Sequence, residues 1–421
     1  FSSGAENGIN ILFGSEQYYV FTLKYHVNNP SISQGISQIA LPPDTSFQKI
    51  VYTSIDPKPD KIESDTDGNW IATYTIEAQK ELTVTATGVA TIYLKPTVQV
   101  SVVKPDSVYL QEKLYWETSN PEVQRLAKEL KTPRAIYDYL VRTYSYDYSR
   151  LAMADQRRRG AAATLQSKTD ALCQEFTDSF IAIARAAGIP ARELNGFAYT
   201  ENPRLRPLSL VGDLLHAWPE YYDAQKKLWI PIDPTWGNTT GGVDFFSKLD
   251  FNHLVFAIHG VSSEKPYPAG VYKIQGKEGR DVEVKLSSIG QEVARLLSVS
   301  APTMLRPNTV TVRNLTGSSW YDIPIFLRSQ PVLRFTNKTP STVTLLPFEQ
   351  REVEVSAYST NWISKQKGSV TITIGDESVQ YETTTGSIDI GLAVGIGFGL
   401  SVVAAGCVLV FGSRFKRAVR R

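Results

Sequence analysis

A run of 22 residues without a charged side chain, residues 390–411, is the feature that most restricts how this chain can be built. As a helix rising about 1.5 Å per residue, the run is long enough to cross the hydrocarbon layer of a membrane, which is roughly 30 Å thick. We therefore expect one transmembrane helix over residues 388–412. The basic tail, residues 413–421, should stay cytoplasmic, because positive charge is retained on that side. The chain is thus predicted to be a single-pass protein of the cell membrane, with its N-terminal body outside.

The basic tail accounts for the positive charge of the chain. There are 44 basic and 42 acidic side chains, a formal net charge of +2, and five of the basic ones lie in the tail. The body is therefore slightly acidic, so we expect no nucleic acid as a partner.

Three glycines in the apolar run, Gly391, Gly395 and Gly399, are spaced by four residues. This spacing lets two membrane helices approach closely, so a weak dimer through these residues is one interpretation. Glycine is also common in membrane helices, and this second interpretation needs no partner.

The body is too long for one ordinary hydrophobic core and suggests several folded units. Short runs rich in valine, isoleucine, threonine and tyrosine predict an N-terminal β-sandwich domain over residues 1–114. Similar runs return over residues 300–386, where we expect an immunoglobulin-like β domain. Residues 115–265 mix helical and strand patterns and should form an α+β domain. Residues 266–299 begin with a stretch rich in proline, glycine and lysine and are predicted to be a linker.

Cys173 is the only cysteine outside the apolar run, and it opens a predicted helix. Apolar residues from Leu172 onward recur at helical spacing, and Gly188 and Pro190 then end the pattern. Cys173 therefore falls in the first turn, where unpaired backbone N–H groups and the helix dipole favour an anion. A thiol in that position is suited to act as a thiolate nucleophile.

His216 and Asp233 follow Cys173 in the sequence and lie on a predicted β-hairpin. Two aromatic and β-branched runs, residues 216–222 and 227–233, are joined by a polar stretch. If Tyr222 pairs with Lys227, His216 lies directly opposite Asp233 and shares a face with it. Asp233 could then orient the imidazole while the other ring nitrogen faces the thiol.

These residues resemble the transglutaminase-like superfamily, which has a papain-like cysteine enzyme core, in a membrane-anchored bacterial or archaeal type. The matching motifs are Cys173-Gln174-Glu175-Phe176, Ala186-Ala187-Gly188-Ile189-Pro190-Ala191-Arg192, Asn195-Gly196-Phe197, His216-Ala217-Trp218-Pro219-Glu220 and Asp233-Pro234-Thr235-Trp236. The resemblance implies that Cys173 is the nucleophile, His216 the general base and acid, and Asp233 the residue that orients it. The expected fold is multidomain: an α+β papain-like transglutaminase core flanked by β-sandwich domains, plus the C-terminal transmembrane helix.

Four further residues are candidates for the cleft. An oxyanion hole should combine the backbone N–H of Cys173 with a second donor, for which Tyr146 and Gln166 are candidates. Trp218 and Trp236 flank the histidine and the aspartate, and they could form groove walls or simply pack in the core. The chain's four histidines and two cysteines are dispersed without ligand spacing, so we expect no metal and no cofactor.

The sequence favours an extracytoplasmic, membrane-anchored cysteine enzyme that cleaves amide bonds of peptides or proteins through a thioester. A cell-envelope polymer is a further candidate substrate. Two alternatives stay open. One is a protein-cross-linking transamidase, which passes the acyl group of glutamine to an amine. The other is a catalytically inert surface adhesion or scaffold protein.

Overall fold

The computed structural model describes residues 14–385 with short gaps, and the expected transmembrane helix, basic tail and glycine triplet lie outside the described residues. The gaps are residues 99, 101–104, 152, 154–156, 209–214, 274–278, 304–307, 331–332, 336–337, 356 and 359–365. No helix within the described ranges is long and apolar enough to cross a membrane. The chain divides into two compact units. The first is residues 1–296 with 314–321 and 345–349, and the second is the remainder from Leu297 onward.

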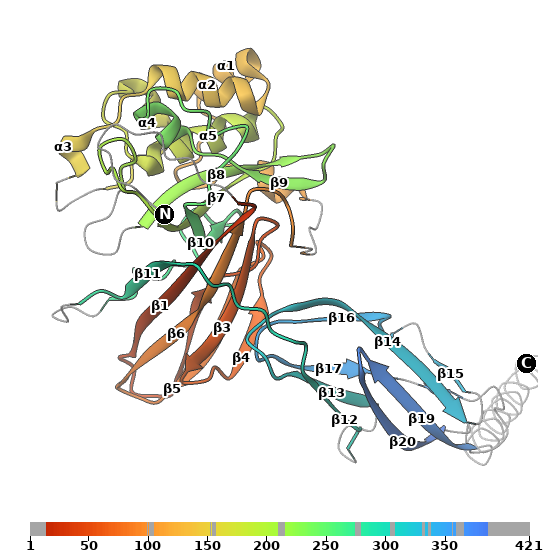
Figure 1. The fold of residues 1–421 in the computed structure, drawn as a ribbon. Coiled ribbons are helices and arrows are strands. Elements are labelled where there is room, and N and C mark those ends of the chain that lie inside the picture. The colour runs from red at the N-terminus through yellow and green to blue at the C-terminus, as the bar shows by residue number, and fades with distance from the viewer. Residues whose placement is uncertain are drawn as a thin grey trace, which may run out of the picture. The chain divides into compact units, whose positions relative to one another are not determined.

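Two antiparallel sheets form the N-terminal part of the first unit (Figure 1). The strands of the first, in order, are β11 (Val282–Ser287), β1 (Glu16–Asn29), β6 (Lys80–Tyr93) and β3 (Gln48–Asp56). Those of the second are β2 (Gly35–Leu41), β5 (Trp70–Ile76) and β4 (Lys61–Ser64). Alternate residues of β1, among them Tyr19, Phe21 and Leu23, are buried in one core with Ile39 and Trp70 of the second sheet. The period-two pattern therefore gives each sheet one apolar face, and the two faces share a core.

Strand β11 corrects the prediction of a linker over residues 266–299. It pairs antiparallel with β1, from Tyr18 opposite Ser287 to Leu23 opposite Val282. The prediction was wrong for this segment because the proline, glycine and lysine content just before it dominated the sequence pattern. A short strand with only one buried residue, Val282, has too weak an alternation to be recognised in the sequence.

Six α-helices and a 3₁₀ helix of the described chain precede or surround a third sheet. They are η1 (Ser107–Leu110), α1 (Pro121–Leu130), α2 (Pro133–Thr143), α3 (Tyr148–Leu151), α4 (Ala161–Ser167), α5 (Cys173–Ala186) and α6 (Pro234–Thr239). The sheet has the order β10 (His253–His259), β7 (Ala191–Ala198), β8 (Leu215–Asp223) and β9 (Leu228–Pro231). The side chains of Asn120 and Thr132 cap α1 and α2, each of which has proline at its start.

Helix α5 is the central helix of this segment. It begins at Cys173, as the apolar spacing predicted, and Phe176 and Phe180 are fully buried in a core shared with α1 and α2. Gly188, with φ of +80°, ends the helical region in the left-handed conformation that glycine favours. The long buried stripe therefore fixes the position of the helix N-terminus, where the thiol lies.

The β8–β9 hairpin forms, but its register differs from the predicted one by two residues. Tyr222 lies opposite Trp229 instead of Lys227, and Glu220 lies opposite Pro231. The loop still has four residues, but it lies one residue further along the chain, between Asp223 and Leu228. Asp223 accepts hydrogen bonds from the backbone N–H groups of Gln225 and Lys226 within this loop. A shift of two residues keeps every side chain on its predicted face.

The second unit is built from strands alone within its described residues. Its strands belong to sheets ordered β12-β13-β17, β16-β14-β19-β20 and β15-β18. They are β12 (Leu297–Ser300), β13 (Thr309–Asn314), β14 (Trp320–Gln330), β15 (Arg334–Phe335), β16 (Thr342–Leu345), β17 (Gln350–Glu354), β18 (Ala357–Tyr358), β19 (Gln366–Ile374) and β20 (Glu377–Thr385). Val310, Val312, Ile372 and Ile374 are fully buried. Strands were expected here; the immunoglobulin-like topology stays a prediction.

Candidate active site

Cys173 is the first residue of α5, and a polar network holds the chain in place just before it. Its side chain is fully buried. Glu175 accepts the backbone N–H of Leu172 at 2.9 Å and thereby closes the helix start. The same carboxylate accepts hydrogen bonds from Arg150 at 3.0 Å and from the backbone N–H of Arg159 at 3.1 Å. The thiol therefore lies at the positive end of a helix whose first turn is fixed.

Asp233 lies beyond the end of β9 and is the N-cap of α6. One carboxylate oxygen, Oδ1, accepts the backbone N–H groups of Thr235 at 2.9 Å and Trp236 at 3.1 Å. The other oxygen, Oδ2, lies 2.9 Å from Nε2 of His216. The predicted pairing of His216 with Asp233 is thus found as a hydrogen bond, made from a helix cap and not from opposed strand positions. The cap fixes the carboxylate plane and leaves one oxygen for the imidazole.

The electrostatics of this pair favour a charged imidazolium. Burial alone would lower the pKa of His216, but the charge and hydrogen bond of Asp233, followed by those of Cys173, raise it to about 9. Burial would raise the pKa of Asp233, yet His216 and then His253 hold it well below its usual value. Since Nε2 is bound to Asp233, Nδ1 is the ring nitrogen left for the interaction with Cys173 that contributes to the raised pKa. Apart from that interaction, Nδ1 has no hydrogen-bond partner among the described residues.

Two tryptophans stack on the imidazole of His216. The ring of Trp236 lies 5.3 Å from it at 20°, and that of Trp218 lies 5.7 Å from it at 22°. Both indoles are fully buried, and Trp236 donates to the carbonyl of Pro207 at 3.2 Å. The structure brings both predicted residues to the site, where they hold the ring orientation; a role as groove walls stays a prediction.

His253 is a residue of this network that the sequence reasoning missed. Its Nε2 lies 3.2 Å from Oδ2 of Asp233, and its Nδ1 lies 2.8 Å from Asp250. Burial would lower its pKa, but Asp250 and then Asp233 raise it to about 9. The available signal was the short spacing between Asp250 and His253, which brings a carboxylate to the ring from three residues away. The link to Asp233 depends on tertiary structure and leaves no local pattern.

The side chains of His216, Asp233 and His253 also satisfy the distances of a metal site. Their ligand atoms all lie within 4.8 Å of one another, and all three residues are buried. The separations of 2.9 and 3.2 Å from the two Nε2 atoms to Asp233 are those of hydrogen bonds. We interpret the cluster as hydrogen-bonded, because a metal there would occupy the nitrogens that bind Asp233. The expectation of no metal therefore remains a prediction.

The two candidate oxyanion donors differ in their surroundings. Tyr146 is buried, and its backbone bridges to Ala171, two residues before Cys173. Burial and then the charge of Cys173 raise the pKa of its hydroxyl well above the usual range. The hydroxyl has no hydrogen-bond partner within the part of the chain that the structure describes. Gln166 is exposed on α4 and is the weaker candidate for a buried site.

A known family matches the part of the chain that carries these residues. Residues 118–234 match the family model described as the transglutaminase-like superfamily, and these residues therefore form a transglutaminase-like domain. This domain contains Cys173, His216 and Asp233. A search of curated proteins found no match.

Two solved structures are similar to this chain. One is described as a "putative cysteine protease from Cytophaga hutchinsonii"; it is 18% identical, covers 67% of this chain and 93% of its own, and has a TM-score of 0.42. The other is red sea bream transglutaminase, which is 12% identical and covers 84% of this chain and 95% of its own, with a TM-score of 0.25.

Proposed function

We propose that this protein is an extracytoplasmic, membrane-anchored cysteine enzyme that cleaves amide bonds of peptides or proteins through a thioester. One observation carries the proposal. The imidazole of His216 is held by Asp233 through Nε2, and Cys173 contributes to the raised pKa of the same ring, which supports Nδ1 as the nitrogen that exchanges a proton with the thiol. A nucleophile, a proton carrier and an orienting carboxylate in that order are the requirements of covalent acyl transfer.

In the proposed reaction, His216 carries the proton that the leaving amine needs. The Cys173 thiolate attacks the amide carbon, and the resulting oxyanion is bound by the backbone N–H of Cys173 and the hydroxyl of Tyr146. The C–N bond breaks as Nδ1–H of His216 protonates the leaving amine, which leaves a thioester on Cys173. His216, now neutral, takes a proton from water as the water oxygen attacks the thioester carbon. The C–S bond then breaks, and the acid product leaves with the thiolate and the imidazolium restored.

The test exploits the fact that the chain has two cysteines, Cys173 and Cys407. The full-length protein would be incubated with quenched fluorescent peptides and with a labelled primary amine. We expect peptide cleavage that is abolished in Cys173→Ala and retained in the matched control Cys407→Ala. Stable transfer of the amine to glutamine-bearing protein would instead identify a cross-linking transamidase. If Cys173→Ala changes neither reaction and the thiol resists alkylation, the inert scaffold alternative is correct.

Membrane anchoring is tested separately. The apolar run of residues 390–411 supports it, together with the basic tail that follows. Truncation after residue 386 should release the protein from membranes after alkaline washing, whereas the full chain should stay with them. Labelling of Cys173 from outside intact cells by an impermeant thiol reagent would support the outward orientation, and labelling only after lysis would contradict it.

A further inference from the structure

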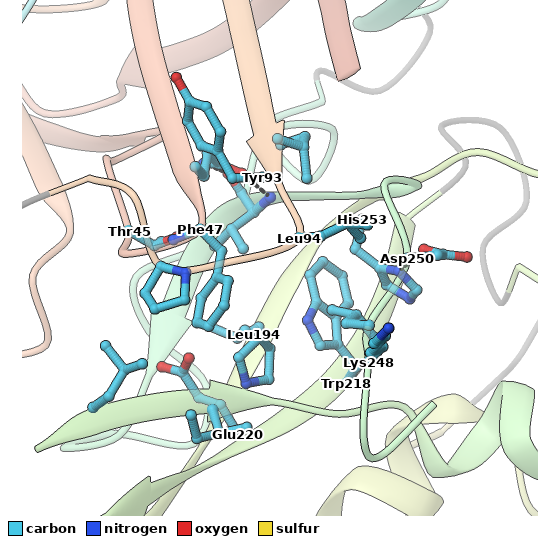
Figure 2. A pocket seen from close by; sticks show the side chains of 18 of the residues that line it. Thr45, Phe47, Tyr93, Leu94, Leu194, Trp218, Glu220, Lys248, Asp250 and His253 are labelled. Carbon is cyan, nitrogen blue, oxygen red and sulfur yellow. Dashed lines mark hydrogen bonds and ion pairs between the residues drawn. The ribbon is translucent and has the colours of Figure 1, made fainter. Parts of the chain in front are cut away.

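A cavity of about 260 Å³ lies beside the third sheet of the first unit. Figure 2 shows it between the N-terminal sheets and the third sheet. The N-terminal side contributes Phe47, just before β3, and Tyr93, the last residue of β6, and the third sheet contributes Leu194 and Trp218. Its described lining does not include Cys173, His216 or Asp233. The cavity is therefore distinct from the place where the thiol would react, although Trp218 belongs to the walls of both.

Trp218 supplies a buried indole N–H to the lining of this cavity. Its side chain is fully buried, and Nε1 makes no hydrogen bond with any described residue. In Figure 2 the indole nitrogen lies on the side away from His253, among the other lining side chains. A buried N–H without an acceptor carries a free-energy cost, because it has lost its hydrogen bond to water. A ligand that places an oxygen there would recover that cost.

The charges around the cavity favour an anion. Its two carboxylates already have cationic partners: Glu220 binds Arg192, and Asp250 binds His253. Two lysines of the lining, Lys226 and Lys248, are exposed at the surface. Lys226 lies 3.5 Å from Asp223, whereas Lys248 is not paired with a carboxylate among the described residues. The indole N–H and the ammonium of Lys248 can therefore both bind an oxygen acceptor.

We infer that this cavity binds a small carboxylate with an apolar body. The apolar part would occupy the space between Phe47, Tyr93 and Leu194, and the carboxylate oxygens would accept hydrogen bonds from Trp218 and the lysines. The volume is below the roughly 300–1,000 Å³ of sites for drug-sized ligands, so a single ring on a short chain is the expected size. The inference does not rest on the proposed function, since it requires no reaction at Cys173.

Fluorine NMR on the full-length Cys173→Ala protein tests this inference, because the thiol is then absent. The chain has seven tryptophans, and 5-fluorotryptophan labelling gives each a resonance; Trp218→Phe identifies that of Trp218. We expect 4-phenylbutyrate to shift this resonance saturably, and the matched amine 4-phenylbutylamine to bind at least about ten-fold more weakly.

Variants locate the binding site. Charge reversal in Lys226→Glu with Lys248→Glu should weaken carboxylate binding about ten-fold or more, since it replaces attraction by repulsion. Lys227→Glu, in the same turn but outside the lining, is the matched control and should bind normally. Leu228→Trp should fill the cavity and abolish binding. The inference is overturned if the amine binds as tightly as the carboxylate, if the lysine variant binds normally, or if the Trp218 resonance does not move up to about 10 mM ligand.

Discussion

At the scale of single residues, Asp233 has two tasks that its two oxygens divide. Oδ1 caps α6, and Oδ2 accepts from His216 and His253. The sequence indicated Asp233 because it follows His216 in a hairpin pattern and opens the motif Asp233-Pro234-Thr235-Trp236, which resembles that of the transglutaminase-like superfamily. It could not indicate the second histidine, because the contact between β10 and α6 depends on how the whole sheet packs. Pairs were therefore predictable at this site, and the branched network was not.

Asp233→Asn should separate the two tasks. The amide oxygen can still cap α6, but the charge that stabilises the imidazolium is lost. We expect kcat/KM to fall by about 10²–10⁴-fold. Tm should fall more at about pH 6, where both histidines bound to Asp233 are charged, than at about pH 9. Steady-state kinetics and thermal unfolding check this. Asp250→Asn is the matched control: it changes the next carboxylate along the network and should have a much smaller kinetic effect. Equal losses in the two variants would contradict the role of Asp233.

The raised pKa of His216 predicts the alkaline limit of activity. The reaction needs the imidazolium to protonate the leaving amine, so kcat/KM should fall as pH rises through about 9. Because the folded pKa lies above the unfolded value near 6.5, the associated stability is present below about pH 6.5 and is lost as pH rises to about 9. In Asp233→Asn the alkaline limb should move to lower pH. A pH–rate profile with an unmoved limb would argue against the ion pair.

Tyr146→Phe tests the second oxyanion donor. Loss of one donor should lower kcat by about 10²–10³-fold. Stability should stay the same or rise slightly, since the variant removes a buried hydroxyl that has no described partner. Tyr144→Phe is the control. That hydroxyl donates a hydrogen bond to Ser179, at a distance of 2.7 Å, and has no role in the proposed reaction. It should lower the free energy of unfolding by about 1 kcal/mol and leave kcat unchanged. The opposite pattern in the two variants would exclude Tyr146.

At the scale of elements, the start of α5 and the β8–β9 hairpin show which features the periodicity of apolar residues can predict. Apolar spacing placed Cys173 in the first turn of a helix, because a long series of apolar residues at helical spacing fits only one secondary structure. The hairpin pattern gave the correct faces but the wrong register. The four-residue loop begins one residue later than predicted, after Asp223, which accepts backbone hydrogen bonds from within the loop. Face is set by alternation, whereas register depends on turn geometry that the strand residues do not encode.

One side chain of the arginine run, residues 157–159, is paired with buried carboxylates. Such runs usually form solvated surfaces. Arg158 instead reaches the buried carboxylates of Asp178 and Glu193 and contacts the latter at 2.6 Å. Asp178 lies on α5 and Glu193 on β7, so this guanidinium ties the helix that carries the thiol to the sheet that carries the histidine.

Arg158→Met should therefore destabilise the first unit strongly. Removal of the guanidinium leaves two buried carboxylates without their cation, a change that costs about 3–5 kcal/mol. Arg157→Ala, at an exposed position of the same run, should change stability by less than about 0.5 kcal/mol. Chemical denaturation of both variants measures the difference. Similar unfolding midpoints would show that the run acts only as a charged surface.

At the scale of the whole molecule, the N-terminal sheets and the transglutaminase-like segment are not independent. Phe197, Leu215, Leu254 and Phe256 of the third sheet are buried in the same core as Tyr19 and the other residues of β1. The sequence pattern suggested a domain boundary near residue 115, because strand patterns give way to helical ones there. A change of pattern marks a change of secondary structure, but it does not show whether a hydrophobic core continues across it.

A fragment of residues 115–265 should consequently fail to fold by itself. It would expose the apolar side chains of Leu254 and Phe256. It would also lose the side-chain oxygens of Asn69 and Gln48, which accept hydrogen bonds from backbone N–H groups of β10. Circular dichroism and limited proteolysis should show an unfolded or aggregated fragment without thiol reactivity. A fragment of residues 14–355, which keeps every described segment of the first unit, should give a cooperative transition. A stable, reactive 115–265 fragment would mean that the shared core contributes little, and the catalytic segment would then be a domain in its own right.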